Sequence, residues 1–479
     1  MSRRPRVLAT FLVTGVALFM TSLDNLVVTN ALPAIRVHLG AGLEGLEWTV
    51  NAYTLSFAVF LLSGAAYGDR FGRRRTFLVG LSVFTAASAA AALAPNVGTL
   101  IAARAVQGVG GAIVVPLTLT ILAGAVTDEW RPMALAGWSA LSGLAIALGP
   151  VIGGAIVQGA NWQWIFWVNV PIGLALLPLG RALLAESVGP NDRLDTPGTV
   201  LATAGLFGVV LGLVRANGSG WTSPLVVGSL AGGAALLVAF VGWERRAAAP
   251  MLPLRLFGVR GFAASNGAAM LLTTGMFGVV FLLAQFLQTV QGYSPLEAGI
   301  RTLPWTAAPV LAAPVAALLA PKVGMRPLVS LGTALQVGSL VWLALAVSPN
   351  VAYPRIVPPL VLAGIGMGLF FALIAPLMLS FVRSADEGIA SGVSNGMREL
   401  GVVLGVAILA AVFAGTGGYA SGAAFVAGLR PALWVGAGLV AVALVTSLLV
   451  PARAARPAAH QTRPAAEPTR PAADLEPAS

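Results

Sequence analysis

Asp24 is the residue whose position most strongly indicates chemistry, because it lies inside a long apolar run. An aspartate at the centre of a membrane helix costs roughly 2.5–3.5 kcal/mol on insertion scales, so it needs water, a partner or a proton. Burial favours the neutral acid and a nearby cation favours the carboxylate, which suits a group that binds and releases a proton. A structural alternative stays open, in which Asp24 only hydrogen-bonds with Asn25 and Thr21.

Arg104 is the natural partner of Asp24. Asp24 lies about 16 residues, or about 24 Å, from the start of its helix, and Arg104 lies about 9 Å from the opposite face. In an apolar core about 30 Å thick these depths nearly coincide, so an ion pair is allowed if the helices adjoin. Gln107 shares the helix face of Arg104. The alternative is that Arg104 extends its side chain to the membrane surface.

Glu399 is a second candidate proton or cation site. Ser384 and Glu387 have the spacing of a capping box, which predicts the start of a helix there. Glu399 then lies about 18 Å along this helix, near the middle of the membrane. Neighbouring helical residues point in different directions, so Glu399 need not pair with Arg398; a structural pair with another helix is an equal alternative.

A few further polar residues share these segments and are candidates for lining a substrate cavity, namely Asn25, Gln107, Asn395 and Arg398. The chain has no cysteine and two histidines, so we expect no metal site. Lys322 is followed by Val323, so the sequence has no Walker A motif. We expect neither catalytic residues nor a cofactor.

The composition indicates a protein that crosses a membrane many times. The 479 residues are 57% hydrophobic and 9% charged, with a mean hydropathy of +0.88. A soluble chain of this length could not bury so much apolar surface. The net charge of +11 is spread over short loops and the tail, which argues against a nucleic-acid partner.

Apolar runs of about twenty residues predict an all-α polytopic membrane protein with fourteen transmembrane helices. The predicted helices are 8–32, 47–67, 76–94, 98–123, 133–157, 164–185, 197–215, 222–243, 261–286, 298–320, 327–347, 355–380, 386–413 and 430–450. Although Arg3, Arg4 and Arg6 precede the first run, that run is too long for a signal peptide, and we expect it to be retained.

A basic segment lies between the second and third predicted helices. It contains Gly64, Asp69, Arg70, Gly72, Arg73 and Arg74. An acid and several arginines cannot lie in hydrocarbon, so we expect an aqueous turn. The excess of arginine predicts that this turn is cytoplasmic, and the even number of helices then places both termini in the cytoplasm.

A weaker copy of this segment indicates a chain built from two repeats. Pro321–Arg326 has the pattern of Asp69–Arg74, and eight predicted helices separate the two copies. We therefore expect a six-helix bundle at 1–195, two inserted helices at 196–258 and a second six-helix bundle at 259–450. The tail at 451–479 is rich in Pro and Ala, and we expect it to be disordered.

The fifth predicted helix contains Gly149, Pro150, Gly153 and Gly154. Small residues at this spacing allow close approach of another helix, and the proline permits a kink. Close packing alone explains the pattern, and a moving hinge is a further hypothesis.

With these residues in view, the chain resembles the fourteen-helix drug:proton antiporter family of the major facilitator superfamily. The basic segment resembles that superfamily's loop between helices 2 and 3. Further segments that resemble family motifs are Leu23–Pro33, Leu100–Gly111, Gly149–Gly154, Trp164–Gly173 and Gly292–Gly299. Two positions depart from the family pattern: Pro321 replaces an acid in the second loop, and Glu399 replaces an uncharged amide.

The resemblance implies a monomeric exporter in the cytoplasmic (inner) membrane that exchanges hydrophobic small molecules, cationic ones among them, for protons. It implies that Asp24 and Arg104 couple the proton and that the basic segment gates the cytoplasmic side. Glu399 is a further candidate for proton coupling from its depth in its helix, not from the resemblance. The fifth-helix motif implies export. The alternative is a transporter of a metabolite on the same fold; the sequence shows no feature of a channel filter or of a membrane enzyme.

Overall fold

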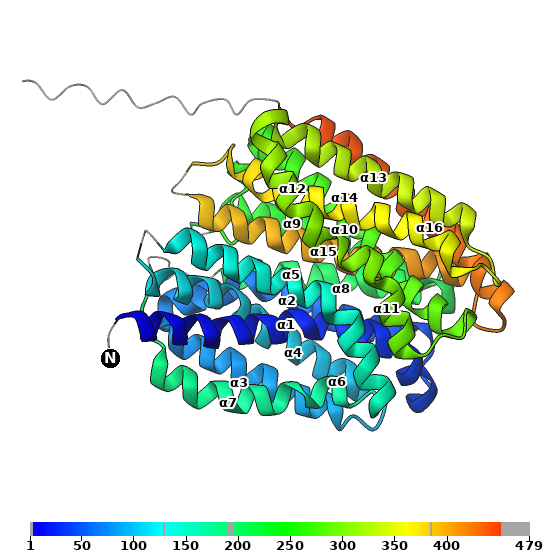
Figure 1. Cartoon of the computed structure of the whole chain (residues 1–479), viewed down its shortest axis with the longest axis horizontal. Helices are drawn as coiled ribbons and strands as arrows, with labels where there is room; N and C mark the ends of the chain where they lie inside the picture. Colours follow the sequence, from blue (N-terminus) through cyan, green and yellow to red (C-terminus); the bar gives the residue numbers. More distant parts are fainter. Residues whose placement is uncertain (1–2, 128–129, 190–194, 249, 384–385, 452–479) are drawn as a thin grey trace, which may run out of the picture.

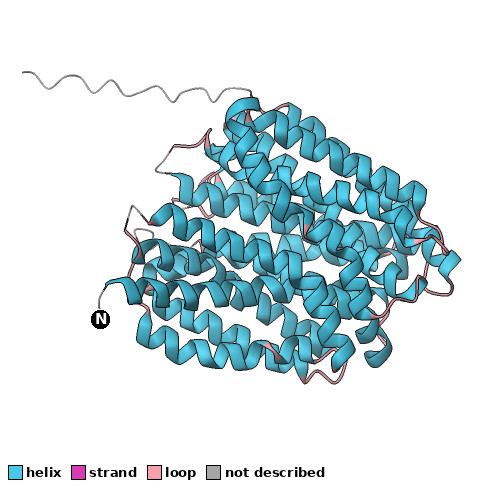
Figure 2. Ribbon diagram, in the orientation of Figure 1, coloured by secondary structure: helices cyan, strands magenta, loops and turns pink. Residues whose placement is uncertain are grey.

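The computed structural model describes residues 3–127, 130–189, 195–248, 250–383 and 386–451. Within these ranges all regular structure is helical and no strand is present (Figure 2). The helices of the N-terminal part are α1 (Arg3–Leu39), α2 (Leu43–Phe71), α3 (Arg73–Ala92), α4 (Val97–Ala125), α5 (Arg131–Gly159), α6 (Trp164–Trp167) and α7 (Asn169–Leu183).

Two helices follow in the middle of the chain, α8 (Thr196–Ser219) and α9 (Pro224–Glu244). The C-terminal part contains the 3₁₀ turn η1 (Leu254–Gly258), α10 (Arg260–Gln285), the π-helical turn η2 (Phe286–Val290), α11 (Pro295–Thr306), α12 (Ala308–Val323), α13 (Met325–Ala346), α14 (Tyr353–Leu379), α15 (Glu387–Thr416) and α16 (Gly422–Leu448).

The described helices provide thirteen segments that are long and apolar enough to cross a membrane, and a fourteenth if the bent helix α2 counts as one span. The helix α2 bends by 50° between Leu61 and Ser63. Two spans each consist of two helices: α6 joins α7, and α11 joins α12. Pro304 and Pro309 flank the break between α11 and α12. Because proline has no backbone N–H to donate, the helical hydrogen-bond pattern is interrupted there. The predicted all-α membrane fold is thus confirmed.

The helix ends differ from the prediction around the basic segment. Asp69 and Arg70 lie in the last turn of α2, and α3 already begins at Arg73. Only Gly72 connects the two helices, so the expected turn of several residues is wrong. Gly72 adopts a φ of 100°, which L residues with a side chain rarely adopt, and this lets one residue reverse the chain.

The long helices run side by side, with the N-terminal helices below and the C-terminal helices above in the view of Figure 1. The helices α2 and α5 of the lower group contact α15 and α11 of the upper group, and α8 packs on α9, α2 and α15. We call the end that carries Arg70, Arg73 and Arg326 the basic end. The opposite end, with the turns at 40–42, 160–163 and 291–294, is the far end.

Candidate functional site

Asp24 and Arg104 form a buried ion pair between α1 and α4. Arg104 Nη1 donates to Asp24 Oδ2, and the side chains of Arg104 and Asp24 are 0% and 1% exposed, respectively. The structure therefore joins the two residues that the depth argument paired, although α1 begins at Arg3 and Asp24 lies about 32 Å along it. Complete burial of Arg104 excludes the alternative in which its side chain extends to the membrane surface.

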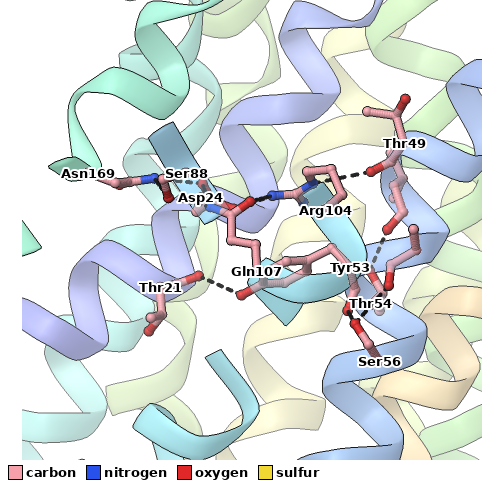
Figure 3. Close-up of polar contacts among 12 residues, drawn as sticks. Thr21, Asp24, Thr49, Tyr53, Thr54, Ser56, Ser88, Arg104, Gln107 and Asn169 are labelled. Atoms are coloured by element: carbon pink, nitrogen blue, oxygen red, sulfur yellow. Dashed lines mark hydrogen bonds and ion pairs between the residues drawn. The ribbon is translucent and has the colours of Figure 1, made fainter. Parts of the chain in front are cut away.

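Amide groups of α4 and α7 complete the hydrogen bonds of Asp24 (Figure 3). Gln107 Nε2 and Asn169 Nδ2 both donate to Asp24 Oδ1, at 2.9 and 2.7 Å. The Ser88 hydroxyl of α3 lies 2.7 Å from Gln107 Nε2 and accepts from it. A buried carboxylate with an arginine and two amide donors is satisfied as the charged form.

Arg104 makes three further contacts that fix its guanidinium. Its Nε donates to Thr49 O at 3.2 Å, and its Nη1 donates to Gln107 Oε1 at 2.7 Å. The guanidinium lies over the ring of Tyr53, 4.2 Å from the ring centre, a favourable cation–π distance. The buried Nη2 has no hydrogen-bond partner. Arg104 therefore has one donor group, Nη2, that forms no hydrogen bond in this arrangement of the site.

The structure also tests the structural alternative for Asp24. The Thr21 hydroxyl donates to Ala17 O and Leu18 O of its own helix, so it does not bind Asp24. The side chain of Asn25 lies outside the described part of the structure. Asn169, Ser88, Thr49 and Tyr53 were not expected at this site, because their helices meet Asp24 only in the folded chain.

Arg398 and Glu399 of α15 lie apart from the Asp24 pair. In the described part of the chain neither forms an ion pair, and Glu399 Oε2 and Arg398 Nε are buried without a partner. Arg398 Nη1 lies 3.3 Å from Oδ1 of the exposed Asn395, and its guanidinium lies 4.9 Å from the ring centre of Phe371. A structural ion pair with another helix is therefore not observed among these residues.

The predicted capping box at the start of this helix stays a prediction. Ser384 lies outside the described residues, and α15 begins at Glu387 with Asp386 as the preceding residue. The Asp386 carboxylate instead binds Arg255 at 2.6 Å and Arg383 at 2.8 Å. The hydrogen bond from Arg255, followed in size of effect by that from Arg383, lowers the pKa of Asp386, so this carboxyl group stays charged at neutral pH. This cluster ties α15 to η1 at the basic end.

The residues of the basic segment bind one another and the chain that follows α7. Arg73 donates from Nε and Nη2 to Asp69 Oδ1, at 3.0 and 2.9 Å. Glu186 accepts from the backbone N–H groups of Arg74 and Arg75, at 2.9 and 3.3 Å. These N–H groups belong to the first turn of α3, where a carboxylate also offsets the helix dipole. Glu186 was not expected from the sequence.

The second copy of the segment has the same backbone geometry. Gly324 alone connects α12 and α13, with φ 96° and ψ 150°, against 100° and 129° for Gly72. Arg74 donates to Leu184 O after α7, and Arg326 donates to Leu448 O at the end of α16. The internal repeat is thus visible in the structure, although Pro321 and Met325 cannot form the pair that Asp69 and Arg73 form.

Alanine at the two connecting glycines gives a matched test of this geometry. A side chain at positive φ costs about 1–2 kcal/mol. At Gly324 a Cβ would make only an ordinary contact, 3.5 Å from Pro327 Cδ, whereas at Gly72 it would lie 2.8 Å from Glu186 Oε1. We expect Gly324→Ala to lower the melting temperature of the detergent-purified protein by a few degrees, and Gly72→Ala to lower it further. Equal shifts for both variants would contradict a role of Glu186 at this connection.

The glycines of α5 lie against two different neighbouring helices, α1 and α11. A Cβ at Gly149 would lie 2.7 Å from Leu26 Cβ, and one at Gly153 would lie 3.0 Å from Val27 Cα, so both glycines allow α5 to approach α1. A Cβ at Gly154 would lie only 2.2 Å from Pro295 O at the start of α11. Gly154 therefore joins the N-terminal and C-terminal helices, a role that the sequence did not indicate.

Contacts at the far end hold the two groups of helices together. Gln288 Nε2 of η2 donates to Asn30 O at 2.9 Å, and the backbone N–H of Leu296 donates to Gln158 Oε1 at 3.2 Å. Together with the approach of Gly154, these contacts form what we call the far-end seal (Asn30, Gly154, Gln158, Gln288 and Leu296). A third hydrogen bond, from Thr306 to Ala147 O, lies deeper in the bundle.

Comparison with known proteins identifies the family of this fold. The sequence model that describes the Major Facilitator Superfamily as a protein family matches residues 14–406. The cephamycin export protein CmcT of Amycolatopsis lactamdurans is 39% identical over 82% of each chain. The multidrug resistance protein Stp of Mycobacterium tuberculosis is 33% identical, covering 85% of this chain and 76% of Stp. The tetracenomycin C resistance and export protein of Streptomyces glaucescens is 32% identical, over 86% and 77%.

Solved structures agree on the fold. The nucleoside transporter NupG superposes with a TM-score of 0.65 at 11% identity, covering 92% of this chain and 99% of NupG. A D-xylose-proton symporter superposes with a TM-score of 0.63 at 14% identity, covering 93% and 98%. With its membrane-spanning helices, its two related connections and this match over most of its length, the chain belongs to the major facilitator superfamily of membrane transporters.

Proposed function

We propose that this protein is a proton-coupled antiporter that exports hydrophobic small molecules, cationic ones among them, across the cytoplasmic membrane. The observation that carries the proposal is the ion pair of Asp24 and Arg104, which is fully buried midway through the membrane helices. Ionisable side chains at this depth are costly and mark ion or substrate pathways. The inward movement of one proton supplies about 2.3 kcal/mol per 100 mV, which can drive uphill export.

Export rather than uptake is favoured by the relatives. The fold alone does not choose, because the nucleoside transporter and the xylose symporter share it. The three relatives described above carry names of antibiotic or multidrug export and resistance. A metabolite transporter remains the alternative, and the direction of proton-driven transport separates the two.

The substrate path would run between the two groups of helices. Asn395, Arg398 and Glu399 lie within one turn of α15, and polar side chains at this depth face a pathway rather than lipid. We propose that these residues contact the substrate and that Glu399 balances a positive charge on it. Positive residues at the basic end favour a cytoplasmic location of that end and of both termini.

Transport would follow alternating access, in which residues 1–195 and 259–450 move against each other. The far-end seal supports this, since it consists of few hydrogen bonds and one close glycine contact. The ion pair of Asp69 and Arg73 would stabilise the basic end during this movement. We propose that one chain is sufficient for the cycle.

Everted membrane vesicles test the proposal directly. The probe is ethidium, a hydrophobic cation, and a panel of antibiotics in a pump-deficient host extends the test to other substrates. We expect a proton gradient to load the vesicle lumen with the probe, because the cytoplasmic face of an everted vesicle points outward. Substrates that leave the lumen with the gradient would support the alternative of uptake.

A disulfide across the far-end seal tests alternating access. The chain has no cysteine, so the double variant Gln158→Cys with Leu296→Cys introduces the only thiols. The contact between these residues favours bond formation. We expect oxidation to stop efflux and a reductant to restore it, with the single variants unaffected. Full efflux by the cross-linked protein would rule out opening at this seal.

A further inference from the structure

Glu47 is a buried carboxyl group near the far end that has no role in the site described above. It lies about 6 Å along α2 from the first residue, Leu43, and it is 3% exposed. Its Oε2 atom is buried without a hydrogen-bond partner. In the part of the chain that the structure describes, no arginine or lysine lies within ion-pair distance of it.

Asn51 lies one turn further along the same face of α2 and is fully buried. Neither its Oδ1 nor its Nδ2 has a hydrogen-bond partner. A buried polar group without a partner costs about 1–3 kcal/mol, so three such atoms on adjacent turns need an explanation. Water molecules held between Glu47 and Asn51 would satisfy them, as buried water does in other proteins.

The charged groups around Glu47 are engaged with other partners. Glu44, on the previous turn, forms an ion pair with Arg215 of α8 at 2.9 Å. The Arg36 guanidinium of α1 lies 3.7 Å from the ring centre of Tyr419, whose hydroxyl donates to Gln285 of α10.

Tyr419 also shows that Glu47 lies close to this group. Burial raises the pKa of Tyr419, Arg36 lowers it, and a charge on Glu47 raises it further. In the described part of the chain, Arg36 lies on the Tyr419 ring and no cation forms an ion pair with Glu47. An unpaired buried carboxylate is strongly unfavourable, so the arrangement suits the neutral acid.

The position of Glu47 connects it to both the seal and the ion pair. Two residues further along α2, Thr49 O accepts the hydrogen bond from Arg104 Nε, and Asn51 lies between Thr49 and the Tyr53 ring that contacts Arg104. Towards the far end, Arg36 and Tyr419 bring α1 together with the loop after α15. Glu47 is thus buried in the structure, in which the far-end seal is formed.

We propose that Glu47 is a second proton-binding carboxyl, loaded from the far side, and that the far-end seal closes only over its neutral form. When the seal is open, water reaches the carboxylate, and a proton from water forms an O–H bond on it. When the seal closes, Asn51 and trapped water form hydrogen bonds with the neutral carboxylic acid of Glu47. The inference deepens the proposed proton-coupled export, because it links external protons to the closing step.

The test measures opening of the far end without substrate or gradient. Ala31 is fully buried beside Asn30 of the seal, and Ala31→Cys introduces the only thiol of the chain. A membrane-impermeant thiol reagent is added to the outside of intact cells at external pH from about 6 to about 9. Each rate is divided by the rate for the unfolded protein, which cancels the pH dependence of the thiol.

With Glu47 present, we expect the corrected labelling rate to rise about tenfold or more over this range, since loss of one proton opens the seal. Glu47→Gln imitates the neutral acid and should label slowly at every pH. Glu44→Gln is the matched control, because Glu44 is half-exposed and one turn away, and it should keep the pH dependence. Equal pH dependence in Glu47→Gln, or none in the parent protein, would overturn the proposal.

Infrared spectroscopy supplies a second measurement that does not require a functional variant. A neutral carboxylic acid should absorb at neutral pH in the parent protein, and this band should be lost in Glu47→Gln and kept in Glu44→Gln. If Glu47→Gln does not fold, Glu47→Asp retains the acid and should retain both the band and the pH-dependent labelling. Absence of the band in the parent would also overturn the proposal. The vesicle test of efflux is independent of both measurements, so each hypothesis can fail alone.

Discussion

Asp24→Asn is expected to abolish proton-driven efflux and to destabilise the protein strongly. The substitution leaves Arg104 fully buried without its carboxylate, and breaking a buried ion pair in this way costs about 3–5 kcal/mol. The amide cannot bind and release a proton at physiological pH, so the coupling step is lost even where the protein folds. Efflux in vesicles and thermal unfolding in detergent measure the two effects separately.

A double variant separates folding from coupling. Asp24→Asn with Arg104→Gln removes both charges, and we expect it to recover much of the stability while efflux stays absent. Thr21→Val is the matched control on the same helix, since the Thr21 hydroxyl bonds only the backbone of α1, and it should transport normally. Normal proton-driven efflux by the double variant would show that the pair is structural.

Gly154→Ala is expected to reduce efflux at least tenfold by forcing the far-end seal apart. The new Cβ would lie 2.2 Å from Pro295 O, and a backbone carbonyl at the start of α11 cannot turn aside as a side chain can. Such a contact must be relieved by moving α5 away from α11, which favours the open far end. Labelling of Ala31→Cys from outside should therefore become faster in this variant, independent of pH.

Gly143→Ala is the control for Gly154→Ala. It lies on the same helix with nothing within 4 Å of its added Cβ. Alanine in a helix is favoured over glycine by about 1 kcal/mol, so we expect unchanged or slightly higher stability and normal efflux. Slow labelling and normal efflux in Gly154→Ala would exclude the proposed importance of this contact.

The sequence was sufficient for the elements that hold the site, because each depends on local pattern and length. Apolar runs about as long as the membrane is thick predicted the spans, including the interrupted ones. Counting residues along two helices placed Asp24 and Arg104 at one depth, and the structure joins them. The ion pair of Asp386 with Arg255 was not predicted, because its two residues lie far apart in the sequence.

Other features depend on which helices become neighbours, and no local pattern contains that information. Asn169 of α7 donates to Asp24, and Ser88 of α3 accepts from Gln107 and Asn169; neither has a spacing that marks it in the sequence. Glu186 meets the first turn of α3 only because the chain after α7 returns to the basic end. Gly154 resembled the other two glycines of the motif, yet an added Cβ would meet α1 at Gly149 and Gly153 and α11 at Gly154.

The sequence by itself determined the membrane fold, the repeat and the depth of Asp24, since hydropathy and rise per residue act along one helix. Only the tertiary structure decided which of the buried acids received partners that stabilise a negative charge. Asp24 received an arginine and two amides, whereas Glu47 received no cation. Both acids lie in apolar helices, and the difference arises because neighbouring helices supply the partners that make a buried charge stable.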